Sequence, residues 1–382
     1  MSEWREYKLG ELVKTNTMSI DKNYPYSNIE YLDTGSITCN HIESLQDFEL
    51  VKAPSRAKRL VQEDDIIYSS VRPNQLHYGY IVNPQENLVV STGFVTITCN
   101  KTLINPKFLY YFLTQSHITE YLHSVAEAST SAYPSLKPSD IESLDIEIPP
   151  LSEQQRIASI LSSLDDKIDL LHRENETLEA MAETLFRKWF VEDAKEDWKE
   201  GKLGEEFDFT MGQSPNGESY NTEGIGIPMY QGNADFGFRF PTKRVFTTQP
   251  TRFAEINDTL ISVRAPVGAQ NMAIERCCIG RGVAAFRYKN NSSLYSYTYY
   301  KLKSLLNEIK QYNDNGTVFG SISKSDFENL DIVIPDKDTI LNFQKQVKPI
   351  DDKIINNSKQ IQTLTQQRDG LLSKLMSGEV KI

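Results

Sequence analysis

The side chains that could perform catalysis are scattered along this 382-residue chain, without the spacing of a catalytic or metal-binding motif. Its four cysteines lack the paired spacing that binds zinc. The sequence contains no glycine-rich phosphate loop and no dinucleotide-binding fingerprint. We therefore expect no catalytic residue, bound cofactor or metal. For Cys39, Cys99, Cys277 and Cys278 we expect reduced, buried thiols in a cytoplasmic protein.

One short run, Asn105-Pro106-Lys107-Phe108, has part of the Asn-Pro-Pro-Phe motif of adenine methyltransferases. The second proline is missing, and no cofactor-binding glycine loop precedes the run. We interpret it as a turn that begins a helix.

The formal net charge of −11 argues weakly against binding to nucleic acid. Acidic residues concentrate in residues 1–197, whereas the remainder is close to neutral. A neutral domain can still present a basic face to phosphates, so the total does not decide the matter. No apolar run is long enough to suggest a membrane span, and the first residues lack the pattern of a signal peptide.

The elements that must position any functional side chain are duplicated. The block Ser139–Pro149 returns as Ser325–Pro335, and Asp165-Asp166-Lys167-Ile168 returns as Asp351-Asp352-Lys353-Ile354. Both matches have the same offset, 186 residues, obtained as 325 − 139 and 351 − 165. Weaker matches with larger offsets relate the segments around Trp4 and Trp198, and the dipeptides Val71-Arg72 and Val263-Arg264. The chain is therefore expected to have an internal pseudo-twofold repeat.

Two long helices are predicted from apolar residues at alternating steps of four and three. The first seam is Ile157, Leu161, Leu164, Ile168, Leu171, Asn175, Leu178, Ala182, Leu185 and Trp189. The second is Phe343, Val347, Ile350, Ile354, Asn357, Ile361, Leu364, Arg368, Leu371 and Leu375. This heptad spacing is typical of coiled coils. We expect the two helices to pack antiparallel within one chain, with Asn175 and Asn357 facing each other and setting the register.

Short β-rich runs and a late helical segment, near 106–126 and 292–312, precede each long helix. The expected fold class is α+β, with two mixed α/β domains separated by the two helices. We place the domains at 1–150 and 198–335, and the helices at 151–193 and 336–378.

The run from Ile148 to Ala158 resembles the first conserved region of specificity subunits of type I restriction-modification systems. Leu185–Val191 resembles the end of that conserved helix, and Leu371–Val380 resembles the end of the second. The resemblance covers essentially the whole chain. At Asp336–Ile340 the second copy departs from the Leu-Ser-Glu-Gln-Gln pattern of the first.

This resemblance implies a non-catalytic subunit with two target-recognition domains, each reading one part of a split, asymmetric site on double-stranded DNA. The helices would act as a spacer and dock two modification subunits, which bind S-adenosylmethionine and methylate adenine. Two restriction subunits that use ATP and Mg would add translocation and cleavage.

The resemblance also suggests which loop residues contact DNA, because arginine pairs bidentately with guanine, and asparagine or glutamine with adenine. In the first domain the candidates are Arg56, Lys58, Arg59, Arg72, Asn74, Gln75, His77, Tyr78, Ser129, Thr130, Ser131 and Tyr133. In the second they are Gln213, Ser214, Tyr230, Gln231, Asn233, Arg239, Lys243, Arg244, Arg264, Asn315, Thr317 and Phe319. The Val-Arg dipeptides recur in both halves, so they could instead serve the shared fold or position phosphates.

Two other interpretations compete with this one. The chain could be a coiled-coil scaffold whose globular ends bind proteins, or a fused enzyme with divergent motifs. Salt-sensitive binding to a split DNA sequence distinguishes the first of these from a DNA reader. Methyl transfer by the isolated chain would indicate the second.

Overall fold

The computed structural model describes residues 4–128, 135–313 and 320–380. Its internal contacts divide the chain into two compact units. The first, unit 1, comprises Met1–Leu170 and Gln360–Ile382, and the second, unit 2, comprises Leu171–Lys359. Each unit contains a mixed α/β domain and one part of each long helix.

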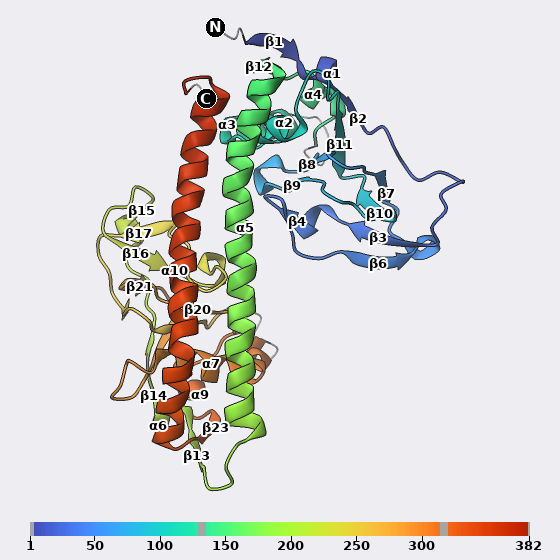
Figure 1. Cartoon of the computed structure of the whole chain (residues 1–382). Helices are drawn as coiled ribbons and strands as arrows, with labels where there is room; N and C mark the ends of the chain where they lie inside the picture. Colours follow the sequence, from blue (N-terminus) through green and yellow to red (C-terminus); the bar gives the residue numbers. More distant parts are fainter. Residues whose placement is uncertain (1–3, 129–134, 314–319, 381–382) are drawn as a thin grey trace. The chain divides into compact units, whose positions relative to one another are not determined.

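The long helices are α5 (Leu151–Arg187) and α10 (Lys337–Met376). A π-helical turn, Lys188–Glu192, continues α5. Every position of the two predicted seams is buried or half-buried, as a heptad seam requires. The helical prediction is therefore confirmed, and Figure 1 shows both helices, α5 in green and α10 in red.

Within each unit the segments of α5 and α10 run antiparallel. In unit 1, Leu161 at the start of α5 shares a core with Leu375 at the end of α10. In unit 2 the order is reversed, because Phe186 near the end of α5 packs on Phe343 near the start of α10, with ring centroids 5.6 Å apart. The antiparallel pairing expected from the repeat is thus present in both units.

Asn175 and Asn357 lie against each other in the seam of unit 2, and each is 1% exposed. Asn357 Nδ2 donates to Asn175 Oδ1 at 3.0 Å and to Glu174 Oε2 at 3.0 Å. Asn175 Nδ2 lies 3.5 Å from Ser358 Oγ. The two buried amides satisfy each other, and a shift of the helices by one heptad would separate them.

We predict strong non-additivity for this pair. Each single replacement, Asn175→Leu or Asn357→Leu, should cost about 1–3 kcal/mol, because the remaining buried amide loses its partner. The double variant should be close to the wild-type stability, since both polar groups are then gone. Urea denaturation with circular dichroism provides the measurement. A double variant destabilised by the sum of the single losses would show that the two amides act independently.

In the first domain, four antiparallel strands form one sheet in the order β2 (Val13–Thr15), β11 (Phe94–Cys99), β8 (Ile66–Ser69) and β9 (Tyr78–Tyr80). A second sheet has the order β6 (Gln46–Glu49), β3 (Asn28–Leu32), β10 (Leu88–Ser91) and β7 (Ala57–Leu60). In it, β3 and β10 are parallel. A small hairpin pairs β4 (Ile37–Thr38) with β5 (His41–Ile42).

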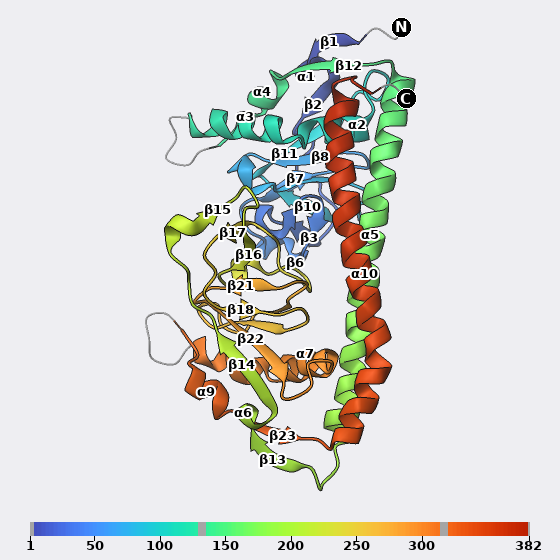
Figure 2. The same ribbon diagram turned by 90° about the vertical axis from the view of Figure 1, so that its left-hand side faces the viewer.

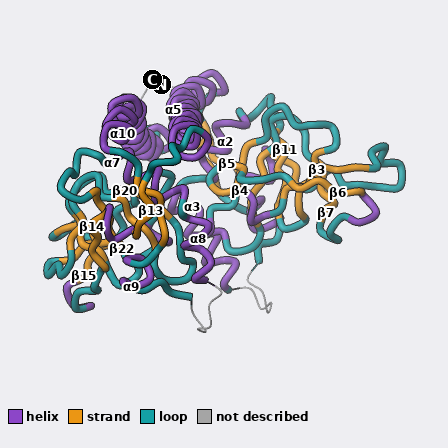
Figure 3. The backbone as a smooth tube through the Cα atoms, turned by 90° about the horizontal axis from the view of Figure 1, so that it is seen from below, coloured by secondary structure: helices purple, strands orange, loops and turns teal. Residues whose placement is uncertain are grey.

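The second domain repeats this topology. Its antiparallel sheet has the order β14 (Phe207–Met211), β22 (Val283–Tyr288), β19 (Thr259–Ser262) and β20 (Gln270–Met272). Its other sheet has the order β15 (Tyr220–Asn221), β17 (Val245–Thr247), β16 (Ile227–Tyr230), β21 (Cys277–Ile279) and β18 (Phe253–Ala254), with β16 and β21 parallel. Among the described residues, β15 has no counterpart in the first domain, and the β4–β5 hairpin has none in the second. Figures 2 and 3 let the reader follow the strands of each domain separately. The internal repeat therefore extends through domains whose sequences have diverged.

Helices cover the antiparallel sheet of each domain. They are α1 (Leu9–Leu12), α2 (Pro106–Leu113), α3 (Ser116–Glu127) and α4 (Pro138–Glu142), and then α6 (Leu203–Glu206), α7 (Tyr295–Ser304), α8 (Leu306–Lys310) and α9 (Lys324–Glu328). Each predicted late helical segment is in fact two helices. The turn interpretation of Asn105 is confirmed, because its side chain accepts from Phe108 N at 3.0 Å and caps α2.

The two ends of each repeat pair with each other. Strand β1 (Arg5–Lys8) is antiparallel to β12 (Asp145–Ile148), and β13 (Lys199–Lys202) is antiparallel to β23 (Asp331–Ile334). The glycine after each first strand faces a backbone carbonyl. A Cβ on Gly10 would lie 3.3 Å from Glu142 O, and one on Gly204 would lie 3.2 Å from Glu328 O. These contacts explain why the Leu-Gly dipeptide and the Ser-Asp block recur together.

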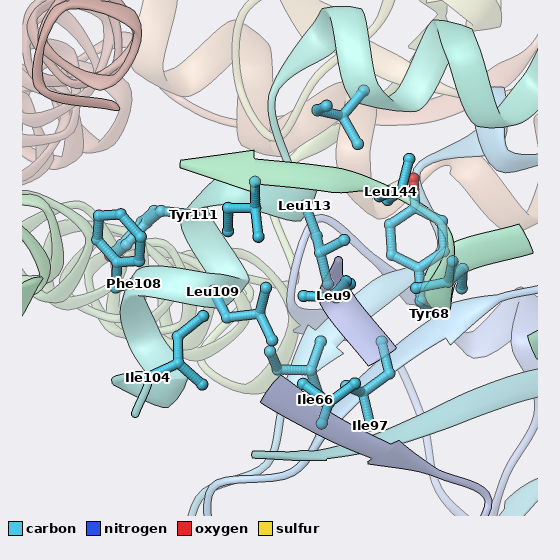
Figure 4. Close-up of a cluster of buried hydrophobic side chains, with 14 of the residues drawn as sticks. Leu9, Ile66, Tyr68, Ile97, Ile104, Phe108, Leu109, Tyr111, Leu113 and Leu144 are labelled. Atoms are coloured by element: carbon cyan, nitrogen blue, oxygen red, sulfur yellow. The ribbon is translucent and has the colours of Figure 1, made fainter. Parts of the chain in front are cut away.

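The main core of unit 1 lies between the β8–β11 face and the helices α1, α2 and α5. Figure 4 shows Leu9, Leu109 and Leu113 converging in this cluster with Ile66 and Ile97. The side chains of Leu9, Leu109 and Leu113 are fully buried. The core thus joins the sheet to the start of the long helix, as the entering strand β12 also does.

The first aspartate of each Asp-Asp-Lys-Ile block accepts a hydrogen bond from a tyrosine of its own domain. Tyr111 Oη donates to Asp165 at 2.6 Å in unit 1, and Tyr300 Oη donates to Asp351 at 3.3 Å in unit 2. Each aspartate also pairs with an arginine, but from a different source. Arg368 of α10 lies 2.9 Å from Asp165, whereas Arg239 of the second domain lies 2.6 Å from Asp351.

The position that corresponds to Arg368 in the other helix is occupied by Ala182, since 368 − 182 equals the repeat offset of 186. Ala182 is fully buried. An alanine there leaves the charge of Asp351 without a helical cation, and the guanidinium of Arg239 supplies it instead. The two halves therefore neutralise the same repeated carboxylate in different ways.

Candidate nucleic-acid interface

The candidate cations of the first domain lie on β7 and beside it. Arg56 and Lys58 are exposed, and Arg59 is half-buried. Burial lowers the pKa of Arg59, and no hydrogen-bond partner for its buried Nε is present among the described residues. Strand β7 is the last named strand of its sheet, and the segment 18–20 pairs with its outer edge, since Ile20 N donates to Lys58 O at 2.8 Å and Leu60 N donates to Met18 O at 3.2 Å.

The segment after β8 divides its five candidates into two groups. Arg72, Asn74 and Gln75 are exposed on a 3₁₀ turn, Pro73–Gln75. His77 Nδ1 instead lies 2.5 Å from Ile37 O, and Tyr78 is 7% exposed. The hydroxyl of Tyr78 donates to Cys39 Sγ at 3.6 Å. His77 and Tyr78 therefore pack this turn, whereas the first three side chains remain available to a ligand.

Seven candidates fall outside the described residues, namely Ser129, Thr130, Ser131, Tyr133, Asn315, Thr317 and Phe319. The residues that follow these two loops pair with the Val-Arg dipeptides in both domains. Leu136 N donates to Ser70 O at 2.7 Å, and Ile322 N donates to Val263 O at 3.2 Å. The two Val-Arg dipeptides thus lie beside corresponding segments, but the paired residue shifts by one, since Val71 bridges to Ser135 and Arg264 bridges to Ser321.

Five candidates of the second domain line one cleft of about 450 Å³. Its lining includes Ser214, Gln231, Asn233, Arg244 and Arg264, which the sequence predicted, and Asp235 and Arg281, which it did not. Gln213, just before Ser214, is exposed. The cleft is thus lined by three arginines and by side chains that can donate and accept hydrogen bonds.

The three arginines differ in their partners. Arg244 pairs with Asp235 at 2.5 Å. Arg281 contacts a neutral side chain, because its Nε donates to Ser214 Oγ at 3.3 Å. Within the described part of the chain, no carboxylate lies within ion-pair distance of Arg264 or Arg281. Two uncompensated guanidinium groups therefore line the cleft, which suits an anion such as a phosphate.

Arg239 must be removed from the candidate DNA contacts. It is 2% exposed, and its guanidinium lies between Asp351, Glu179 and the ring of Tyr299, 3.4 Å from the ring centroid. Burial alone would lower its pKa, but Asp351 and the neighbouring tyrosines and Glu179 raise it above the usual value. A residue enclosed in this way stabilises the domain and cannot reach a ligand.

Two further candidates of the second domain are engaged elsewhere. Tyr230 is 1% exposed in the core of its sheet, so it is not available to DNA. Lys243 is exposed but forms an ion pair with Glu275. The expectation of buried thiols also needs one correction, because Cys39 is exposed, whereas Cys99, Cys277 and Cys278 are buried and free.

Sequence reasoning overlooked Arg281, although the run Gly280-Arg281-Gly282 contained a signal. A Cβ on Gly282 would lie 2.0 Å from Gln231 O, so the backbone there must pass very close to the strand end. Two glycines around an arginine after a buried strand therefore mark a tight turn that presents a cation.

Among the described residues, no group of three or more His, Cys, Asp or Glu side chains could hold a metal ion. No helix in the described ranges is long and apolar enough to cross a membrane.

Comparison with known proteins places these features in a family. The model of the type I restriction modification DNA specificity domain matches residues 1–180 and 195–366. The HindI specificity subunit of Haemophilus influenzae is 26% identical, over all of both chains. The MjaIX specificity subunit of Methanocaldococcus jannaschii is also 26% identical, over 85% of this chain and 79% of its own.

A solved S subunit of a type I restriction-modification system from M. genitalium has the same fold. It is 20% identical, with a TM-score of 0.60, and the match covers 98% of this chain and 96% of that one. Both repeats are matched by the family model, and the topology of the two domains is duplicated. The chain therefore belongs to the type I restriction-modification DNA specificity family.

Proposed function

We propose that this chain is the DNA-recognition subunit of a type I restriction-modification complex and has no catalytic activity of its own. The observation that carries the proposal is the cleft of unit 2, where no carboxylate of the described residues pairs with the guanidinium groups of Arg264 and Arg281. Uncompensated arginines beside amide and hydroxyl groups suit a phosphate backbone and base edges.

The proposal assigns 1–150 and 198–335 to two different target-recognition domains. Their topologies agree, whereas the residues at equivalent places differ, since Pro73 and Asn74 follow the Val-Arg dipeptide of the first domain and Ala265 and Pro266 follow that of the second. Two different readers imply an asymmetric, split site.

The helices, assigned to 151–193 and 336–378, would dock two modification subunits, and restriction subunits would join through them. A cytoplasmic location stays a prediction.

The methylation pattern of cells that express this chain with its modification subunit tests the proposal. We expect methylated adenines in a split sequence whose two halves differ. A contiguous palindromic site would contradict two separate readers. Absence of salt-sensitive DNA binding by the assembled complex would instead favour a protein scaffold.

Arg264→Ala is expected to weaken DNA binding about equally on all sequences. Loss of one phosphate contact should also reduce the slope of log K against log salt by about 1. The matched control is Arg276→Ala, because Arg276 is exposed, pairs with Glu255 and does not line the cleft. Equal weakening by both variants would mean that Arg264 acts only through overall charge.

A further inference from the structure

Arg244 differs from the other arginines of the cleft because its orientation is fixed. Its Nε and Nη2 donate to the same oxygen of Asp235, at 3.2 Å and 2.5 Å. The Arg244 side chain is 52% exposed, whereas that of Asp235 is 6% exposed. A buried carboxylate thus holds one edge of a guanidinium whose remaining surface faces solvent.

The carboxylate itself is held rigidly by the backbone. Its other oxygen accepts from Gln231 N at 2.6 Å. Thr242 N donates to Asp235 O at 2.8 Å, and Phe236 pairs with Pro241 in a narrow hairpin. The tip of this hairpin carries Arg239, which the helices of unit 2 enclose. Asp235 therefore cannot follow a mobile arginine, and it fixes the direction of Arg244.

The ion pair changes what Arg244 can bind. Because Asp235 neutralises its charge, Arg244 gains less from a phosphate than Arg264 or Arg281 does. Hydrogen bonding is not lost, since a guanidinium has five N–H donors and Asp235 takes only those on the Nε edge. The free Nη1–Nη2 edge can donate two parallel hydrogen bonds, the pattern that guanine O6 and N7 accept in the major groove.

We infer that Arg244 reads a guanine base, that Asp235 is its positioning residue, and that Arg264 and Arg281 hold the neighbouring phosphates. This inference rests on the proposed function, and it assigns a chemical target to one side chain of the cleft. It requires at least one G·C pair in one half of the recognition site.

Arg244→Lys tests the inference, because lysine keeps the charge and loses the two-pronged donor. The complete complex is titrated against duplexes that carry the wild-type site with all four base pairs at each position. The wild-type complex should discriminate against the other pairs at one G·C position by about 10- to 100-fold. Arg244→Lys should abolish the preference at that position and leave the preferences elsewhere unchanged.

Two variants make the result specific. Arg276→Lys, the matched control, should leave every base preference intact, because Arg276 pairs with Glu255 and does not line the cleft. Asp235→Asn retains an acceptor for Gln231 N but holds Arg244 less firmly, so it should reduce the preference at the same position. Circular dichroism and urea denaturation establish that each variant is folded.

Several results would overturn the inference. These are a site without a guanine, unchanged base preferences in Arg244→Lys, or a loss by Arg244→Lys that is equal on all sequences and accompanied by a smaller salt slope. In each of these cases specific binding by the wild-type complex would persist, so the proposed function would stand. Failure of the wild-type complex to bind any split sequence would instead remove the proposed function itself.

Discussion

Replacement of Arg239 by methionine is expected to lower the free energy of unfolding of unit 2 by about 3–5 kcal/mol. The guanidinium is the cation nearest to Asp351, which is 1% exposed. Burial already raises the pKa of Asp351, and loss of Arg239 would leave this carboxyl group uncompensated. Methionine fills similar space without the charge. Urea denaturation of the full-length chain, followed by tryptophan fluorescence, measures the effect.

Two comparisons separate this effect from a general loss of arginine. Arg276→Met breaks an exposed ion pair with Glu255, so it should cost less than about 1 kcal/mol. Adding Asp351→Asn to Arg239→Met removes the uncompensated carboxylate, and the double variant should recover most of the lost stability. If it is no more stable than Arg239→Met alone, the loss reflects packing around the long side chain.

Glu206→Gln is expected to stabilise the chain by about 3 kcal/mol at pH 8 and to have little effect near pH 4.5. Glu206 is 3% exposed. Burial raises the pKa of Glu206 from 4.5 to about 7, although Lys301 and the hydroxyl of Tyr297 oppose the shift. Tyr297 Oη donates to one carboxylate oxygen at 2.7 Å, and the other has no hydrogen-bond partner among the described residues.

The direction of the change in stability with pH follows from the binding of a proton to Glu206. Because the folded chain binds this proton more tightly than the unfolded chain does, the wild type loses stability as the pH rises from about 4.5 through about 7. Glutamine is neutral at every pH, so the variant should lack this part of the loss. Urea denaturation between pH 4.5 and pH 8 measures it. Glu205→Gln is the control, since Glu205 is exposed and the hydrogen bond from Lys199 lowers its pKa. Equal pH profiles for Glu206→Gln and the wild type would contradict the assignment.

The long helices and the duplication could be predicted because their signals are periodic or repeated. Apolar residues at heptad spacing indicate which helix positions are buried. A repeated sequence block indicates a repeated structure, whatever the function of that structure. The facing of Asn175 and Asn357 also follows from the repeat, since antiparallel helices about a pseudo-twofold axis bring similar positions together. These inferences needed no knowledge of the domains.

The residues that contact DNA were harder to predict, because the sequence around a loop arginine does not show whether its side chain faces solvent or a buried acidic side chain. Arg239 and Arg244 lie five positions apart, yet one is enclosed by α5 and α10 and the other lines the cleft. What separates them is the hairpin between Asp235 and Thr242, whose pairing is not encoded by any periodic pattern. Arg281 was missed for the converse reason, since its position depends on a close approach between two backbone segments.

The different neutralisation of Asp165 and Asp351 restricts how halves of such chains can be recombined. Suppose two copies of the first half paired through their α5 helices. Each Asp165 would then face Ala182 of the other copy and would lack an arginine, because Arg368 belongs to the second half. Two copies of the second half would instead bring both Arg239 and Arg368 to each Asp351. A pair of first halves would lack one arginine for each Asp165, and a pair of second halves would have one arginine too many for each Asp351. The charges of aspartate and arginine match when one half of each kind is paired. The charge pattern at these sites is thus a compatibility code that favours one half of each kind.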